Sequence, residues 1–201
     1  LYGLGIGAGY IGLHAYAALE LVGLRYDAYH LAETNRLGLF LYALGVIGMV
    51  EELVKFIPFW LVAMRLRHFD EPVDGIIHAS FIALGFASYE NLYFLPGMDG
   101  GEALARAFAS PLVHIMFASI WGYACGRAKL QGRPLLPAAL QGLGLAALLH
   151  GIYDFFAIGL SAWVHVVPPL IILGIWIWRM RLIRRLQLQA LQEEPQNPGG
   201  K

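Results

Sequence analysis

Charged residues are scarce in this chain. Asp, Glu, Lys and Arg make up 14% of its 201 residues, whereas hydrophobic residues make up 58%. Soluble domains carry about 25% charged residues, so this composition indicates an integral membrane protein with the lipid bilayer as its partner. Acidic and basic residues are equal in number, at 14 each, and this balance gives no support to nucleic-acid binding.

Cysteine is nearly absent, and so are several protease motifs. Cys125 is the single cysteine, which excludes an intrachain disulfide and a cysteine-based zinc site. The H-E-x-x-H motif of many zinc proteases is missing. No G-x-G-D motif is available for an aspartyl dyad, and no Glu-x-x-His pair for a di-iron bundle. Any hydrolytic chemistry must therefore use a different set of polar residues.

Long apolar stretches account for most of the chain. Six of them approach the ~20 residues needed to span a bilayer, at about Leu1–Leu24, Leu37–Leu66, Val73–Leu95, Arg106–Ala128, Leu135–Leu160 and Ala162–Trp178. These stretches are too continuous for barrel strands, so we predict an all-α, polytopic membrane bundle of about six transmembrane helices. We expect one transmembrane catalytic domain over residues 1–186. Residues 187–201 are rich in Gln, Glu, Pro and Gly and are expected to form a disordered tail.

Lys and Arg are unevenly divided between the two ends of these stretches. Nine lie at one set of alternate ends: Arg65, Arg67, Arg127, Lys129, Arg133, Arg179, Arg181, Arg184 and Arg185. Three lie at the opposite ends: Arg25, Arg36 and Arg106. Because cytoplasmic loops are enriched in basic residues, we predict that both termini are cytoplasmic.

Two adjacent glutamates, Glu51 and Glu52, lie within the second apolar stretch, and Lys55 follows one turn later. Each charge at mid-membrane costs about 2.5–3.5 kcal/mol on insertion scales, so three of them indicate a function. Lys55 is three or four residues from each glutamate and can pair with either. One such pair would help the helix to insert. It accounts for a single glutamate, and the other is suited to act as a general base.

Polar residues on four predicted helices lie at similar depths. At ~1.5 Å rise per residue, each lies about 20–24 Å from the cytoplasmic end of its helix: Glu51, Glu90, His114 and His150. Asp154 follows His150 by four residues, so it could fix the imidazole tautomer. Two histidines and a carboxylate are a common ligand set for catalytic zinc. The same residues could also activate water without a metal, as a glutamate–histidine pair, and the residues alone leave both mechanisms open.

Four motifs lie between about residues 38 and 158: Glu51-Glu52-Leu-Val-Lys55, the block from Asp74 to Phe86-Ala-Ser-Tyr-Glu90-Asn91, His114, and His150-Gly-Ile-Tyr-Asp154. Together they resemble the motifs of the PrsW family of intramembrane proteases. The CAAX prenyl proteases and related bacteriocin-processing membrane proteases are more distantly similar. Their motifs differ from this chain at Lys55, Glu90 and Asp154, and these differences favour the PrsW branch.

The resemblance implies an intramembrane endopeptidase of a bacterial or archaeal cell membrane. Its substrate would be a membrane-anchored protein of the anti-sigma-factor type, cut near the outer side. We assign catalytic roles to Glu51, Glu52, Lys55 and Asp154, and binding of a divalent metal, zinc above all, to Glu90, His114 and His150. A proton- or cation-coupled transporter is the alternative function, because charged residues at mid-membrane also suit ion coupling. A catalytically inert relative that binds a membrane partner is a third.

Overall fold

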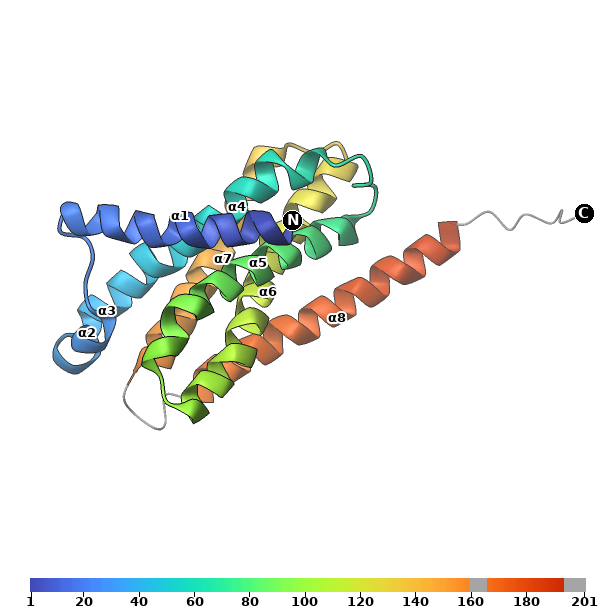
Figure 1. Cartoon of the computed structure of the whole chain (residues 1–201). Helices are drawn as coiled ribbons and strands as arrows, with labels where there is room; N and C mark the ends of the chain where they lie inside the picture. The colour runs from blue at the N-terminus through green and yellow to red at the C-terminus, as the bar shows by residue number, and fades with distance from the viewer. Residues whose placement is uncertain (160–165, 194–201) are drawn as a thin grey trace, which may run out of the picture.

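The structure is a computed structural model that describes residues 1–159 and 166–193, and all regular secondary structure in this part of the chain is helical (Figure 1). The longer helices are α1 (Tyr2–Leu21), α4 (Gly48–Leu61), α5 (Pro72–Phe94), α6 (Gly100–Leu130), α7 (Leu135–Ile158) and α8 (Val167–Glu193). The shorter ones are α2 (Ala28–Thr34), α3 (Arg36–Tyr42), the π-helix η1 (Ala43–Ile47) and the 3₁₀ turns η2 (Ala63–Arg65) and η3 (Leu95–Gly97). The predicted all-α class is confirmed.

Three helical stretches of the described residues are long and apolar enough to cross a membrane: Arg36–Arg65, Gly100–Leu130 and Leu135–Ile158. The six predicted crossings and the cytoplasmic termini stay predictions. The last predicted stretch begins at Ala162, and its first four residues lie outside the described part of the chain. Helix α8 continues to Glu193, beyond the domain boundary predicted at residue 186, because Gln, Leu and Ala in this stretch are good helix formers. Residues 194–201 of the predicted tail also lie outside the described part.

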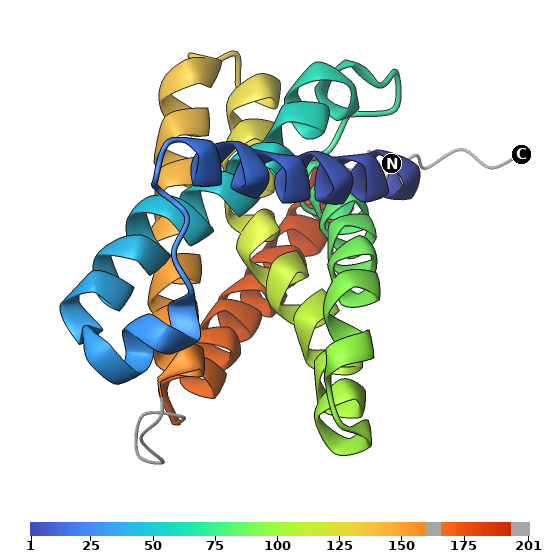
Figure 2. The ribbon, with the colours of Figure 1, turned by 60° about the vertical axis from the view of Figure 1, so that its left-hand side comes forward.

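Small residues allow the helices to approach one another closely. A side chain on Gly75 of α5 would collide with the backbone of Gly122 on α6, and one on Gly5 of α1 would collide with the backbone around Gly85 of α5. Gly48 of α4 meets the backbone of α7 in the same way. Close packing of this kind is typical of helix contacts in membranes. It lets α1 cross over α5 and α4 at a steep angle, as Figure 2 shows.

An aromatic core fills the space between α4 and α6. Phe59 and Trp121 are fully buried, and their ring centroids lie 4.9 Å apart. Phe117 is buried one turn before Trp121. The π-helix η1 directly precedes the turn of α4 that carries Glu51 and Glu52, and such π turns occur frequently at functional sites. The polar residues thus lie between a rigid apolar core and an irregular turn.

Candidate functional site

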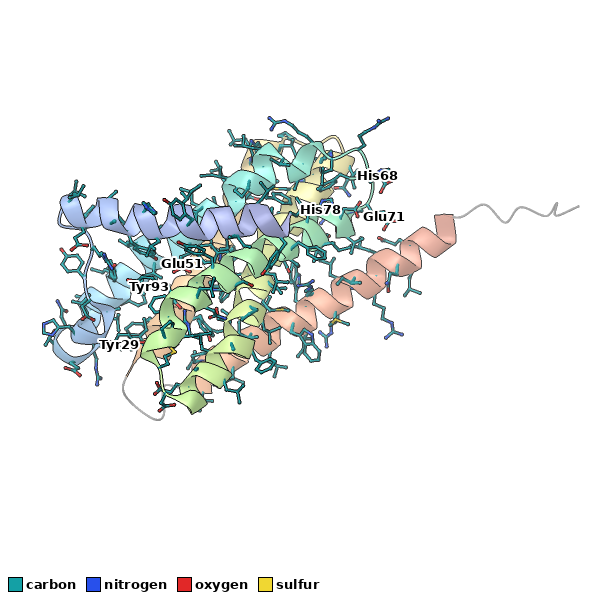
Figure 3. The ribbon with its side chains drawn as sticks, in the orientation of Figure 1. Tyr29, Glu51, His68, Glu71, His78 and Tyr93 are labelled. Atoms are coloured by element: carbon teal, nitrogen blue, oxygen red, sulfur yellow. The ribbon has the colours of Figure 1, made fainter. Side chains whose placement is uncertain are left out.

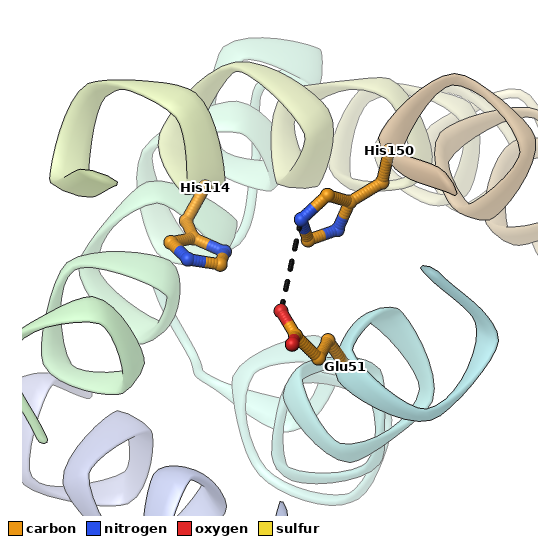
Figure 4. Close-up of side chains that lie close together, drawn as sticks. All are labelled: Glu51, His114 and His150. Atoms are coloured by element: carbon orange, nitrogen blue, oxygen red, sulfur yellow. Dashed lines mark ion pairs between the residues drawn. The ribbon is translucent and has the colours of Figure 1, made fainter. Parts of the chain in front are cut away.

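All seven predicted site residues come together from four helices. Helix α4 carries Glu51, Glu52 and Lys55, α5 carries Glu90, α6 carries His114, and α7 carries His150 and Asp154. Figure 4 shows Glu51, His114 and His150 facing one another. The two imidazole rings lie 5.2 Å apart and nearly perpendicular. The convergence expected from their similar depths is therefore present, whereas the individual roles stay predictions.

Glu52 is enclosed by donors and has no exposed surface. Its Oε1 accepts from Lys55 Nζ at 2.6 Å and lies 2.8 Å from Nδ1 of His150. Its Oε2 accepts a hydrogen bond from Trp121 Nε1 at 2.8 Å. Both oxygens of Glu52 are therefore engaged by buried donors.

His150 presents one ring nitrogen to the other carboxylates. Its Nδ1–H donates to Glu52, and Nε2 faces away from Glu52. Nε2 lies 3.6 Å from Glu51 Oε2 and 3.6 Å from Asp154 Oδ2. The ring stacks on Phe117 at 4.8 Å. The partner that orients His150 in this structure is thus Glu52, a role that the sequence assigns to Asp154, whose buried Oδ2 has no hydrogen-bond partner in the described residues.

His114 has a neighbour at each ring nitrogen. Nδ1 lies 3.0 Å from Lys55 Nζ, and Nε2 lies 3.0 Å from Glu90 Oε2. An ammonium group can only donate, so Nδ1 accepts from Lys55 and Nε2–H donates to Glu90. Glu90 also meets Arg106 at 3.1 Å and Ser110 at 3.2 Å. Polar contacts therefore run without a break from Arg106 to His150.

Four residues of the site were missed by sequence reasoning: Tyr16, Arg106, Ser110 and Trp121. Arg106 and Ser110 lie eight and four residues before His114 on α6, and Trp121 lies seven residues after it. All three therefore share the helix face of His114 and could be found from helical spacing. Tyr16 lies on α1, outside every motif. Its hydroxyl donates to Glu51 Oε1 at 3.1 Å, and no pattern in the sequence indicates this contact.

The cluster fits a divalent cation by donor type, spacing and charge. One ligand atom from each of Glu51, His114 and His150 lies within 4.8 Å of the others. Ligands of a tetrahedral zinc ion lie roughly 3.4 Å apart at bond lengths of about 2.0–2.2 Å, so the three groups would have to move closer together to hold one. With neutral histidines, the four carboxylates of the cluster exceed its two cations, Lys55 and Arg106, by two charges. A divalent cation would offset this excess. Glu90, a predicted ligand, is not in this compact set but lies beside His114.

A cavity of about 750 Å³ extends from the cluster along the bundle. It reaches the α1–α2 connection and the ends of α5 and α7, which the sequence assigns to the outer side. In Figure 3, Glu51, Tyr93 and Tyr29 lie toward this end, and His68 and Glu71 lie at the opposite end. Seven of the ten tyrosines line the cavity: Tyr16, Tyr26, Tyr29, Tyr42, Tyr89, Tyr93 and Tyr153. The cavity can therefore offer tyrosine hydroxyl groups to a polar ligand.

Comparison with known proteins places the chain in a family. It matches the PrsW family intramembrane metalloproteases over residues 1–179. It is 33% identical to Protease PrsW of Oceanobacillus iheyensis over 154 residues, which cover 77% of this chain and 71% of that protein. It is 34% identical to Protease PrsW of Clostridioides difficile, over 68% of this chain and 59% of that protein. It is 31% identical to Protease PrsW of Bacillus subtilis, over 64% of this chain and 60% of that protein. No solved structure matches this chain. The motif resemblance is confirmed, and the chain belongs to the PrsW family of intramembrane metalloproteases.

Proposed function

We propose that this chain is an intramembrane endopeptidase in which Glu51 activates the attacking water. The observation that carries the proposal is the contrast between the two adjacent glutamates. Both oxygens of Glu52 are occupied by buried donors. Glu51 lines the cavity and turns Oε2 toward His150 Nε2 at 3.6 Å. A water between these two groups would have the Glu51 carboxylate as its proton acceptor and the His150 ring as a second polar neighbour.

The reaction follows from this arrangement. Glu51 accepts a proton from the water as its oxygen bonds to the carbonyl carbon of the scissile peptide. The same carboxyl then passes the proton to the amide nitrogen as the C–N bond breaks. Glu52 and Lys55 hold the rings of His150 and His114 in place. If His114 released its hydrogen bond from Lys55, His114, His150 and the neighbouring Glu90 would hold a divalent ion such as zinc, which when bound supplies a Lewis acid for the water and the carbonyl.

The cavity suits a membrane-anchored protein as substrate. A helix must unwind locally before a protease can reach its backbone, and freed amide and carbonyl groups in lipid need new partners. The tyrosine hydroxyls along the cavity can provide them. A juxtamembrane segment of the anti-sigma-factor type, entering from the outer end, fits this geometry. The relatives are bacterial, which supports a bacterial membrane and gives no support to an archaeal one. Family membership does not favour the alternative of a coupled transporter.

Cleavage by purified protein in liposomes tests the proposal, with a single-span protein that carries an anti-sigma-factor juxtamembrane segment. We expect Glu51→Gln to lower the rate by about 10²–10⁴-fold, the usual contribution of a general base. Glu102→Gln, an exposed change at the start of α6, is the control and should cleave normally. Full-rate cleavage by Glu51→Gln would remove this residue from the chemistry. Metal content and chelator sensitivity of the same preparation distinguish a metal-assisted reaction from a metal-free one.

A further inference from the structure

Helix α1 contributes a polar contact to the site. The Tyr16 hydroxyl lies 3.1 Å from Glu51 Oε1, and the half-buried side chain lines the cavity. Within residues 1–159 and 166–193, it is the one side chain that hydrogen-bonds Glu51. His150 Nε2 lies further away, at 3.6 Å. Glu51 thus has a neighbour at each oxygen: Tyr16 of α1 at Oε1 and His150 of α7 at Oε2.

The two cations of the cluster pair with carboxylates other than Glu51. Lys55 lies between Glu52 and His114. Arg106 pairs with Glu90 at 3.1 Å. A buried carboxylate without a cation needs hydrogen-bond donors, and the phenol of Tyr16 is the donor that the fold supplies to Glu51.

Close packing of α1 against α5 fixes the position of the Tyr16 hydroxyl. Gly5, Gly9 and Gly12 are buried on the face of α1 that carries Tyr16. A side chain on Gly5 would meet the α5 backbone, and one on Gly9 would meet Tyr89 of α5. These close contacts leave α1 little freedom to move along or away from α5. The reach of Tyr16 therefore depends on helix packing two and three turns earlier.

We propose that Tyr16 is a positioning residue for the water-activating carboxylate. Its hydroxyl holds Oε1 of Glu51, so that Oε2 stays directed at His150 and at the water. This inference rests on the proposed function of Glu51. It adds α1, which lies outside the recognised motifs, to the working parts of the site.

Tyr16→Phe in the liposome cleavage assay tests the inference, because it removes the hydroxyl and keeps the ring. We expect kcat to fall about 10- to 150-fold, the effect of one lost hydrogen bond to a charged group, and KM to stay within about twofold. Tyr10→Phe is the matched control. Tyr10 lies on the same helix, is 53% exposed and does not line the cavity, so its variant should retain the parent kcat.

Three results bear on the inference in different ways. A Tyr16→Phe variant with unchanged kcat, beside an inactive Glu51→Gln variant, would overturn the role of Tyr16 and leave the proposed function standing. A higher KM with an unchanged kcat would assign Tyr16 to substrate binding or packing and would also overturn it. An active Glu51→Gln variant would remove the proposed function itself.

Discussion

At the scale of single residues, Glu51 and Glu52 are chemically identical neighbours with opposite surroundings. Glu52 is fully buried against Lys55, His150 and Trp121. Removing one partner of a buried ion pair typically costs about 3–5 kcal/mol, because the other charge is left without compensation. We therefore expect Glu52→Gln to lower the free energy of unfolding by about this amount.

Thermal unfolding in detergent measures the difference, with Glu51→Gln as the matched variant one position away. Among the described residues no Lys or Arg pairs with Glu51, so its variant should unfold close to the parent temperature while losing activity. Equal unfolding temperatures for Glu52→Gln and the parent would contradict the anchoring role that we assign to the Glu52–Lys55 pair.

The polar residues could be chosen from the sequence because charges are so rare in its apolar stretches. The hydrogen-bond partners of these residues could not be predicted from the sequence. Glu52 and His150 lie 98 positions apart in the sequence. Whether Glu52 or Asp154 contacts His150 depends on how α4 is rotated against α7. Helical spacing from His114 would have indicated Arg106, Ser110 and Trp121. Tyr16 depends on the path of α1 across the bundle, which no local pattern encodes.

At the scale of helices, the contact of α1 with α5 links packing to activity. A side chain on Gly5 would collide with the backbone around Gly85, and overpacking of this kind costs about 1–3 kcal/mol. Gly5→Ala should push α1 outward and withdraw Tyr16 from Glu51. We expect a several-fold fall in kcat together with a lower unfolding temperature.

Gly7→Ala, two residues away on the same helix, is the control. Nothing lies within 4 Å of the added carbon, and alanine is the better helix former by about 1 kcal/mol. This variant should match or exceed the parent in stability and activity. The same response from both glycines would exclude close packing against α5 as the cause.

The predicted helices differ from the observed ones where regular periodicity breaks. The stretch predicted at about Leu37–Leu66 is divided into α3, η1, α4 and η2, and an apolar pattern cannot reveal a π turn. Helix α2 lies in a segment that the sequence assigns to a connection. Its signal was present, because the Asp27 side chain accepts from the amides of Tyr29 and His30 and caps the helix.

At the scale of the whole molecule, the distribution of basic residues assigns a side to the cavity. The connections with most Lys and Arg should face the cytoplasm, and we therefore expect the α1–α2 connection and the cavity end to lie outside. Cysteine labelling can test this orientation in intact cells, because the native Cys125 is buried and gives a low background. Exposed Glu33 on α2 and exposed Arg67 between η2 and α5 offer one cysteine position for each side.

A membrane-impermeant thiol reagent should label Glu33→Cys in intact cells and Arg67→Cys only after the membrane is opened. Both positions are exposed, so a difference in labelling reports the side of the membrane and not burial. The reverse pattern would place the cavity end in the cytoplasm. A substrate would then have to present its cytoplasmic juxtamembrane segment to Glu51, and the outer cut of the anti-sigma-factor type could not occur.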